Sequence, residues 1–123
     1  MITQKRSIGD IGEELACRFL EENGHTIVER NFPCKFGEID IIAKKGKSLV
    51  FVEVKTAHKG NAMFAQENIT RNKIRKFIKS IEVYFLARKI KPDQLWQMDA
   101  ILVKLDSAGS SSEITRIENI NIS

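Results

Sequence analysis

Hydrophobic and polar residues alternate along two neighbouring segments near the middle of the chain. Every second position is apolar in residues 39–43, and valines occupy every second position in residues 50–54. A period of two predicts β-strands, and Gly46 between the segments predicts that they form one β-hairpin. One face of this hairpin is apolar, and the other carries the ionisable residues Glu38, Asp40, Glu53 and Lys55.

The length of the turn decides which residues of the hairpin face each other. A two- or four-residue loop centred on Lys45-Gly46 would set Asp40 opposite Phe51 and diagonal to Glu53 on one face. Diagonal neighbours lie about 7–8 Å apart between their Cα atoms, a span that two carboxylates can close around one ion. A three-residue loop would instead turn one set of side chains to the opposite face.

Two carboxylates at such a distance favour a bound cation, because they repel and raise each other's pKa unless a positive charge lies between them. Mg²⁺ is the expected ion, with Mn²⁺ as the alternative, since it prefers hard oxygen ligands and is commonly held by one or two carboxylates plus substrate phosphate. We therefore expect Asp40 and Glu53 to be metal ligands. Lys55, two residues after Glu53, would orient or stabilise the water that attacks a phosphodiester.

The spacing of Asp40 and Glu53-Val54-Lys55 resembles the motif of the PD-(D/E)xK phosphodiesterases, although Ile39 stands where that motif has proline. Over nearly its whole length the chain more closely resembles a small bacterial family, the UPF0102 (YraN-like) proteins. Its first half is also similar to archaeal Holliday-junction resolvases. The family resemblance is carried by residues 9–13, 30–31 with 37–43, 50–56 and 69–73, and Asp99 corresponds to a further acid common in the family.

This resemblance implies an α/β restriction-endonuclease-like fold of three layers, with a central mixed β-sheet flanked by helices. It also implies a catalytic glutamate on the first helix, which the spacing of Ile8, Ile11, Leu15 and Phe19 predicts. Two adjacent glutamates compete for that role. Glu14 shares a side with Arg18 and Glu21, as on a solvated face, whereas Glu13 stacks over Ala16, Cys17 and Leu20. The resemblance also places its helical acid at the end of residues 9–13, so the helix pattern and the resemblance both favour Glu13.

The remaining pattern predicts the order helix, strand, hairpin, long helix, strand, strand. The first strand lies around residues 26–30, a loop spans residues 57–66, and the long helix spans residues 70–89 with Thr70 as its cap. Residues 95–103 read as a buried strand that contains Asp99. A carboxylate in an apolar strand needs a partner, so we expect a supporting role for Asp99 rather than metal ligation. Residues 107–112 read as a flexible connection, 113–120 as an edge strand and 121–123 as a tail.

Positive charge is concentrated in the second half of the hairpin and the long helix. The whole chain has a net charge of +4, whereas residues 55–91 alone carry ten Lys or Arg against two Glu. Such a surface beside a metal site suits a polyanion, because basic side chains neutralise backbone phosphates. The alternative is a solvated helix face. The residues expected to contact nucleic acid are Lys59, Arg71, Lys73, Arg75, Lys76 and Lys79.

Composition adds few constraints. A chain of 123 residues with 42% hydrophobic content suits a single domain over residues 1–123. Residues 1–6 lack the apolar run of a secretory signal, and no stretch approaches a membrane span, so we expect no membrane contact and cytoplasmic residence. Cys17 and Cys34 predict two free thiols.

Together these patterns predict a Mg²⁺-dependent nuclease acting on DNA, branched or single-stranded substrates included. Asp40 and Glu53 would hold the metal, Lys55 would act on the water, and Glu13 would complete the site. Two alternatives are a nucleic-acid-binding module without turnover and a structural partner in a DNA-processing assembly. Cutting both strands of a duplex would be easiest for a two-fold homodimer.

Overall fold

The computed structural model describes residues 7–58, 70–106 and 112–120. Its helices and strands follow the predicted order. They are α1 (Ile8–Glu22), β1 (Thr26–Phe32), β2 (Ile39–Lys45), β3 (Ser48–His58), α2 (Arg71–Ala87), β4 (Trp96–Leu105) and β5 (Ser112–Ile117).

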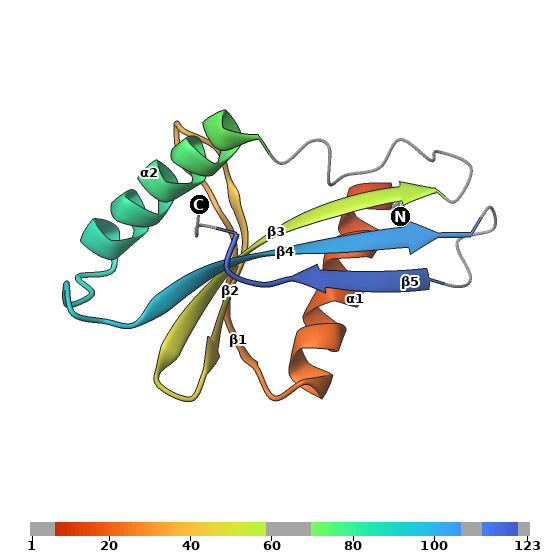
Figure 1. Cartoon of the computed structure of the whole chain (residues 1–123), viewed down its shortest axis with the longest axis horizontal. Helices are drawn as coiled ribbons and strands as arrows, with labels where there is room; N and C mark the ends of the chain where they lie inside the picture. Colours follow the sequence, from red (N-terminus) through yellow and green to blue (C-terminus); the bar gives the residue numbers. More distant parts are fainter. Residues whose placement is uncertain (1–6, 59–69, 107–111, 121–123) are drawn as a thin grey trace, which may run out of the picture.

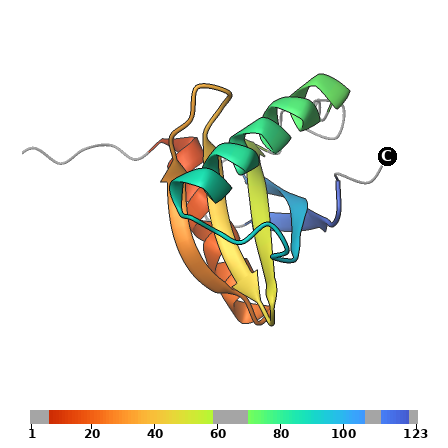
Figure 2. The ribbon, with the colours of Figure 1, turned by 90° about the vertical axis from the view of Figure 1, so that its left-hand side faces the viewer.

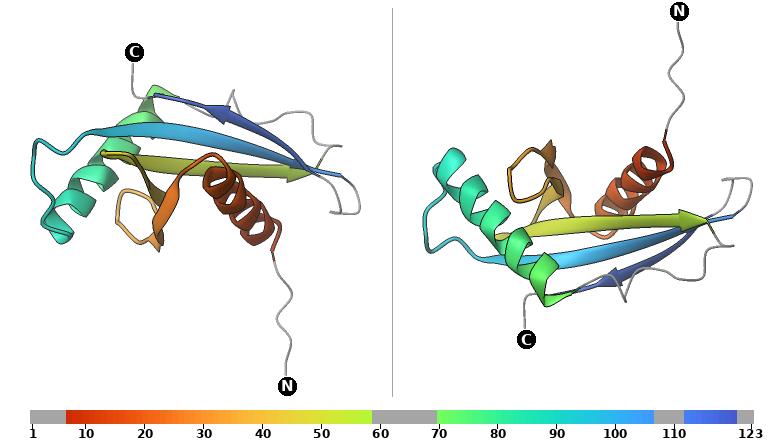
Figure 3. Two further views of the ribbon diagram at one scale, coloured as in Figure 1. Left: turned by 90° about the horizontal axis from the view of Figure 1, so that it is seen from below. Right: turned by 90° about the horizontal axis from the view of Figure 1, so that it is seen from above.

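One five-stranded mixed sheet forms the centre of the molecule. Its strand order is β1-β2-β3-β4-β5, and only β3 and β4 run parallel. The long connection between these two strands contains α2, as a parallel crossover requires. Figures 1 and 3 show the two helices towards opposite ends of the sheet. The predicted α/β fold is confirmed, and its layers are compatible with a restriction-endonuclease-like architecture.

Each face of the sheet is covered by one helix. Val50 and Val52 of β3 pack with α1, whereas Phe51 between them packs with α2. This alternation is the period of two that the sequence shows, but both faces bury apolar side chains. Ile42 and Phe51 lie on the face expected to be ionisable, and both are fully buried because α2 covers that part of the sheet.

The hairpin forms with a different register from the expected one. Its two-residue turn is Gly46-Lys47, and Phe51 pairs with Ile42 rather than with Asp40. The predicted pairing of Asp40 with Phe51 is therefore wrong by two residues. Because a shift of two keeps every side chain on its face, the grouping of the ionisable residues survives the correction.

Several boundaries in the second half also differ from the expected ones. β3 continues to His58, so residues 57–58 belong to this strand and not to the expected loop, and the rest of that loop prediction lies outside the described residues. Thr70 caps α2 as predicted, because its side chain accepts a hydrogen bond from the Lys73 N–H. β5 is an edge strand, as expected. No described helix is long and apolar enough to cross a membrane.

α1 lies close to the sheet at Gly12, where a Cβ atom would overlap the side chain of Thr56 in β3. We expect Gly12→Ala to destabilise the protein by about 1–3 kcal/mol, because α1 must move away from a packed surface. The measurement is the urea concentration at the midpoint of unfolding. Gly9→Ala is the matched control, since a Cβ there meets only Ser7 Oγ, 3.8 Å away.

The double variant Gly12→Ala/Thr56→Ala tests the cause of that effect. Removing the Thr56 side chain removes the atoms that the new methyl group would strike, so the double variant should regain part of the lost stability. A Gly12→Ala variant with the stability of the wild type would show that α1 can shift without cost.

Candidate functional site

Three acidic residues meet where β2 begins. Glu13 comes from α1, Glu38 precedes β2, and Asp40 is the second residue of β2. One carboxylate oxygen from each lies within 4.8 Å of those of the other two, close enough to share a metal ion. Glu13 is the better buried of the two adjacent glutamates, with a side chain 12% exposed against 34% for Glu14. Glu14 pairs with Arg18, as its solvated face predicts.

Asn31 ties two of these acids together. Its side-chain Nδ2 donates a hydrogen bond of 2.7 Å to Glu13 Oε1 and another of 2.7 Å to Glu38 Oε1. The backbone of Asn31 is left-handed, with φ 54°, a conformation that asparagine tolerates better than most residues. Arg30 also approaches Glu13, with its Nη2 atom 3.4 Å from Oε1. Hydrogen bonds of this kind orient carboxylates that bind metals.

Asp40 is the most strongly perturbed acid of the group. Burial, together with the negative charges of Glu13, Glu53 and Glu38, raises its pKa to about 7. A hydrogen bond of 2.8 Å from the Val54 N–H to Asp40 Oδ2 acts in the opposite direction and lowers the pKa. A carboxyl group among other carboxylates is where a divalent cation offsets the most repulsion.

Glu53 and Lys55 lie on the same side of β3, as the two-residue spacing predicts. Lys55 Nζ is 3.4 Å from Glu53 Oε1. Glu53 is near enough to raise the pKa of Asp40, but it is not one of the three acids that meet within 4.8 Å among the described residues. The structure therefore brings Glu13 and Asp40 together directly and holds Glu53 with Lys55 beside them.

A cleft of about 240 Å³ opens next to these residues, between the sheet and α2. Glu38 and Glu53 line its acidic wall, and Lys73 and Lys76 of α2 line a basic one. The loop that joins β1 to β2 rises beside α2, as Figure 2 shows. Ser80 Oγ links these two parts by donating a hydrogen bond of 2.9 Å to the Gly37 carbonyl. The cleft thus juxtaposes a candidate metal site with two lysines.

The other residues expected to contact nucleic acid are not all at this cleft. Arg71 and Arg75 are exposed on α2 but do not line the cleft. Lys79 lies with its Nζ atom 5.4 Å from the centroid of the Phe36 ring, at the mouth of the same region. Lys59 lies outside the described residues.

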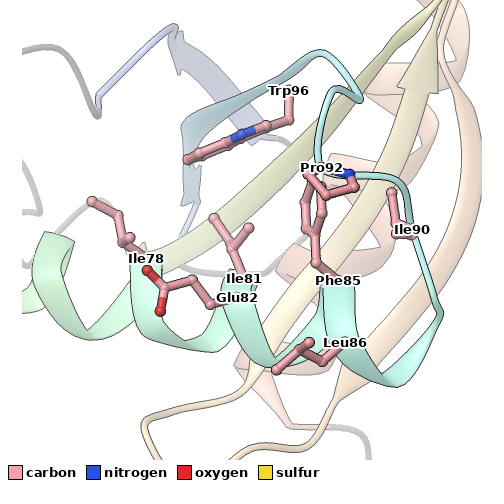
Figure 4. Close-up of a pocket in the computed structure, with 8 residues that line it drawn as sticks. All are labelled: Ile78, Ile81, Glu82, Phe85, Leu86, Ile90, Pro92 and Trp96. Carbon is pink, nitrogen blue, oxygen red and sulfur yellow. The ribbon is translucent and has the colours of Figure 1, made fainter.

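A second pocket, of about 400 Å³, lies along α2 and the segment that leads to β4 (Figure 4). It holds none of the predicted site residues. Glu82 is the only charged residue in its lining, so it offers little to a phosphate or a metal. The lining residues are Ile78, Ile81, Glu82, Phe85, Leu86, Ile90, Pro92 and Trp96.

Known sequences resemble this chain over most of its length. The model of a family described as "Uncharacterised protein family UPF0102" matches residues 12–103. A UPF0102 protein of Caldicellulosiruptor saccharolyticus is 39% identical over 115 residues, which cover 94% of this chain and 97% of that protein. A UPF0102 protein of Campylobacter jejuni is 46% identical over 98 residues, which cover 80% of this chain and 84% of that protein. One of Chloroflexus aurantiacus is 39% identical over 101 residues, covering 82% of each.

The chain belongs to the UPF0102 family. The resemblance to the UPF0102 family noted in the sequence is thereby confirmed. The region that the UPF0102 model matches contains Glu13, Asp40, Glu53 and Lys55, together with Asn31 and Glu38. It ends before β5, so the last strand lies beyond the matched part of this UPF0102 chain.

Asp99 has a complete set of partners in this UPF0102 protein. Its side chain is fully buried in β4. Arg116 of β5 donates to Asp99 Oδ2 from Nε at 2.9 Å and from Nη2 at 2.7 Å. Gln97 and the Asn119 N–H donate to Oδ1 at 2.8 and 3.1 Å. The two bonds from Arg116 join β4 to β5, in keeping with the supporting role expected for Asp99.

One acid of this group, Glu38, and the residue that bridges the acids, Asn31, were not among the predicted site residues. Glu38 is two residues before Asp40, so both side chains lie on the same side of the strand. This spacing is the sequence signal by which Glu38 could have been predicted. Asn31 gives no such signal, because its role depends on a left-handed backbone and on contacts with residues 18 positions earlier and 7 later.

Proposed function

We propose that this UPF0102 protein is a Mg²⁺-dependent phosphodiesterase that hydrolyses nucleic acid, DNA in particular. The observation that carries the proposal is the position of Asp40. It is the one residue that the sequence motif and the spatial group of acids share, and it lies beside the cleft that Lys73 and Lys76 line. Acids for a metal and lysines for phosphates on either side of one cleft suit phosphodiester hydrolysis.

The residues present fit a divalent cation. Glu13, Glu38 and Asp40 offer three oxygen ligands within 4.8 Å of one another, which is the donor set that Mg²⁺ and Mn²⁺ accept. The raised pKa of Asp40, caused first by burial and then by the neighbouring carboxylates, supports the proposal, because a bound cation would stabilise the ionised form of this group. In this proposal Asp40 and Glu53 hold the metal, with Glu13 and Glu38 completing the group.

A bound Mg²⁺ would supply a more acidic water and stabilise negative charge on the reacting phosphate. Side chains of the protein would orient the water and hold the substrate. Lys55, held near the acids by its contact with Glu53, would orient the attacking water and balance its charge. Lys73 and Lys76 would hold the substrate backbone against the opposite wall. Asn31 would keep Glu13 and Glu38 in position.

The test is cleavage of labelled linear duplex, single-stranded and four-way-junction DNA in Mg²⁺, Mn²⁺ or EDTA. We expect metal-dependent cleavage that falls about 100-fold or more in Glu53→Ala and in Lys55→Ala. Glu22→Ala and Lys47→Ala remove the same charges from exposed positions and should cleave like the wild type. DNA binding without cleavage in any metal would reject catalysis and favour the binding module.

A further inference from the structure

The cleft beside the acids has an aromatic side as well as a charged one. Phe36, from the loop between β1 and β2, and Phe77, from α2, both contribute to its lining. Both rings are half-buried, so each presents part of its surface. The cleft therefore offers three surfaces to one ligand: acids that suit a metal, lysines that suit a phosphate, and aromatic rings that suit a planar group.

Phe36 is held in place by contacts of its own loop. The turn that carries it is closed by a hydrogen bond of 3.1 Å from the Gly37 N–H to the Cys34 carbonyl. The bond from Ser80 Oγ to the Gly37 carbonyl fastens that turn to α2. Gly37 has φ 129°, a conformation that residues with a side chain rarely adopt, so this turn favours glycine there. The backbone of the turn that carries Phe36 is therefore held by hydrogen bonds on both sides of Gly37.

Positive charge surrounds the same ring. Lys35 Nζ lies 5.0 Å and Lys79 Nζ 5.4 Å from the centroid of Phe36. With Lys73 and Lys76 inside the cleft, four lysines lie within and around the place where the ring is exposed. An aromatic ring among lysines is the arrangement that binds unpaired nucleotides, because the ring stacks on a base while the lysines hold the backbone.

The volume of the cleft limits what can enter it. At about 240 Å³ it is smaller than the pockets of about 300–1,000 Å³ that enclose drug-sized ligands, and it suits one base with its sugar rather than a base pair. A base in a duplex is stacked on both sides and paired, so it reaches such a pocket only after it leaves the helix.

We infer that the cleft binds one unpaired nucleotide, with its base against Phe36 and its phosphate between Lys73 and Lys76. The site therefore selects single-stranded or locally unpaired nucleic acid over an intact duplex. This inference rests on the proposed function only for the position of the scissile phosphate, which would be the one next to the bound nucleotide. Binding of the nucleotide itself needs no turnover.

The test measures binding without cleavage. Fluorescence anisotropy would compare one labelled oligonucleotide, single-stranded and as a duplex, with Ca²⁺ in place of Mg²⁺. We expect the wild type to bind the single strand at least about tenfold more tightly than the duplex, since stacking on one base contributes roughly 1–3 kcal/mol. Phe36→Leu should lose about 10-fold of single-strand affinity, whereas Phe36→Trp should retain it.

The lysines have a matched control at the far end of the hairpin. Lys73→Gln and Lys76→Gln should each weaken binding and reduce the salt dependence of the affinity by about one counterion. Lys47→Gln removes the same charge from the exposed turn between β2 and β3 and should change neither quantity. Thermal unfolding of every variant would establish that the fold is retained.

Two outcomes separate this inference from the proposed function. Selective single-strand binding that depends on Phe36, without cleavage in Mg²⁺ or Mn²⁺, would support the nucleotide site and reject the phosphodiesterase. Metal-dependent cleavage of duplex and single strand at equal rates, with Phe36→Leu indistinguishable from the wild type, would overturn the nucleotide site and leave the phosphodiesterase intact.

Discussion

Asp40→Asn is expected to abolish metal-dependent cleavage and, at the same time, to make the metal-free protein more stable above pH 7. Asparagine keeps an oxygen that can accept the hydrogen bond from the Val54 N–H, but it removes the charge that a metal needs. Cleavage should fall by about 10³-fold or more, since both the metal and the charge stabilisation it provides are lost.

The gain in stability follows from the raised pKa of Asp40. This carboxyl group titrates at about 7 in the folded protein and near its ordinary value of 3.8 in the unfolded chain. Between these values the folded state binds the extra proton, so the free energy of unfolding falls as the pH rises through that window. At pH 8 the ionised group costs about 4 kcal/mol, a cost that Asp40→Asn removes.

The measurement is the urea midpoint of both proteins in EDTA at pH 4 to 8. The two curves should nearly coincide at pH 4 and separate above pH 5, with the variant the more stable. Asp93→Asn, at an exposed turn position, is the charge-matched control and should follow the wild type. Parallel curves for Asp40→Asn and the wild type would mean that the pKa of Asp40 is not raised in the folded protein.

The second large effect is expected between β4 and β5, in the ion pair of Asp99 and Arg116. Asp99→Ala should destabilise the protein by about 3–5 kcal/mol, because it removes the buried partner of Arg116, whose side chain is only 15% exposed, and leaves that guanidinium with the more exposed Glu118 at 3.4 Å. It also leaves the Asn119 N–H without its acceptor. Chemical unfolding monitored through the single Trp96 measures the loss.

Two further variants identify the cause. Asp99→Leu/Arg116→Met replaces both charges and should recover much of the stability, since a buried ion pair is often matched by apolar side chains of similar volume. Glu29→Gln breaks the more exposed pair with Arg88 and should cost less than about 1 kcal/mol. A cost for Asp99→Ala no larger than that for Glu29→Gln would contradict a structural role for Asp99.

Local patterns were enough to predict most of the fold. The spacing of apolar residues predicted both helices, and Thr70 was correctly identified as the cap of α2. The distinction between Glu13 and Glu14 was also correct, because one turn of helix fixes which side each faces. These features depend on residues within about four positions of one another, so their spacing in the sequence is enough to predict them.

The features that the sequence did not predict depend on distant residues. The hairpin register was wrong by two residues because the position of the turn within residues 45–47 is not determined by alternation alone. The partner of Asp99 lies 17 residues later, on a strand of its own. Glu13, Glu38 and Asp40 meet because β2 starts beside α1, an arrangement that depends on the packing of α1 on the sheet rather than on a local pattern.

The acids of the site are distant in sequence, and this has a consequence for assembly. Glu13 and Asp40 belong to α1 and β2, with all of β1 between them. A cation held by both would act as a reversible cross-link that closes this loop, so its binding and the docking of α1 would support each other. At a free metal concentration 100 times the dissociation constant, mass action would add about 2.7 kcal/mol to the stability of the native state.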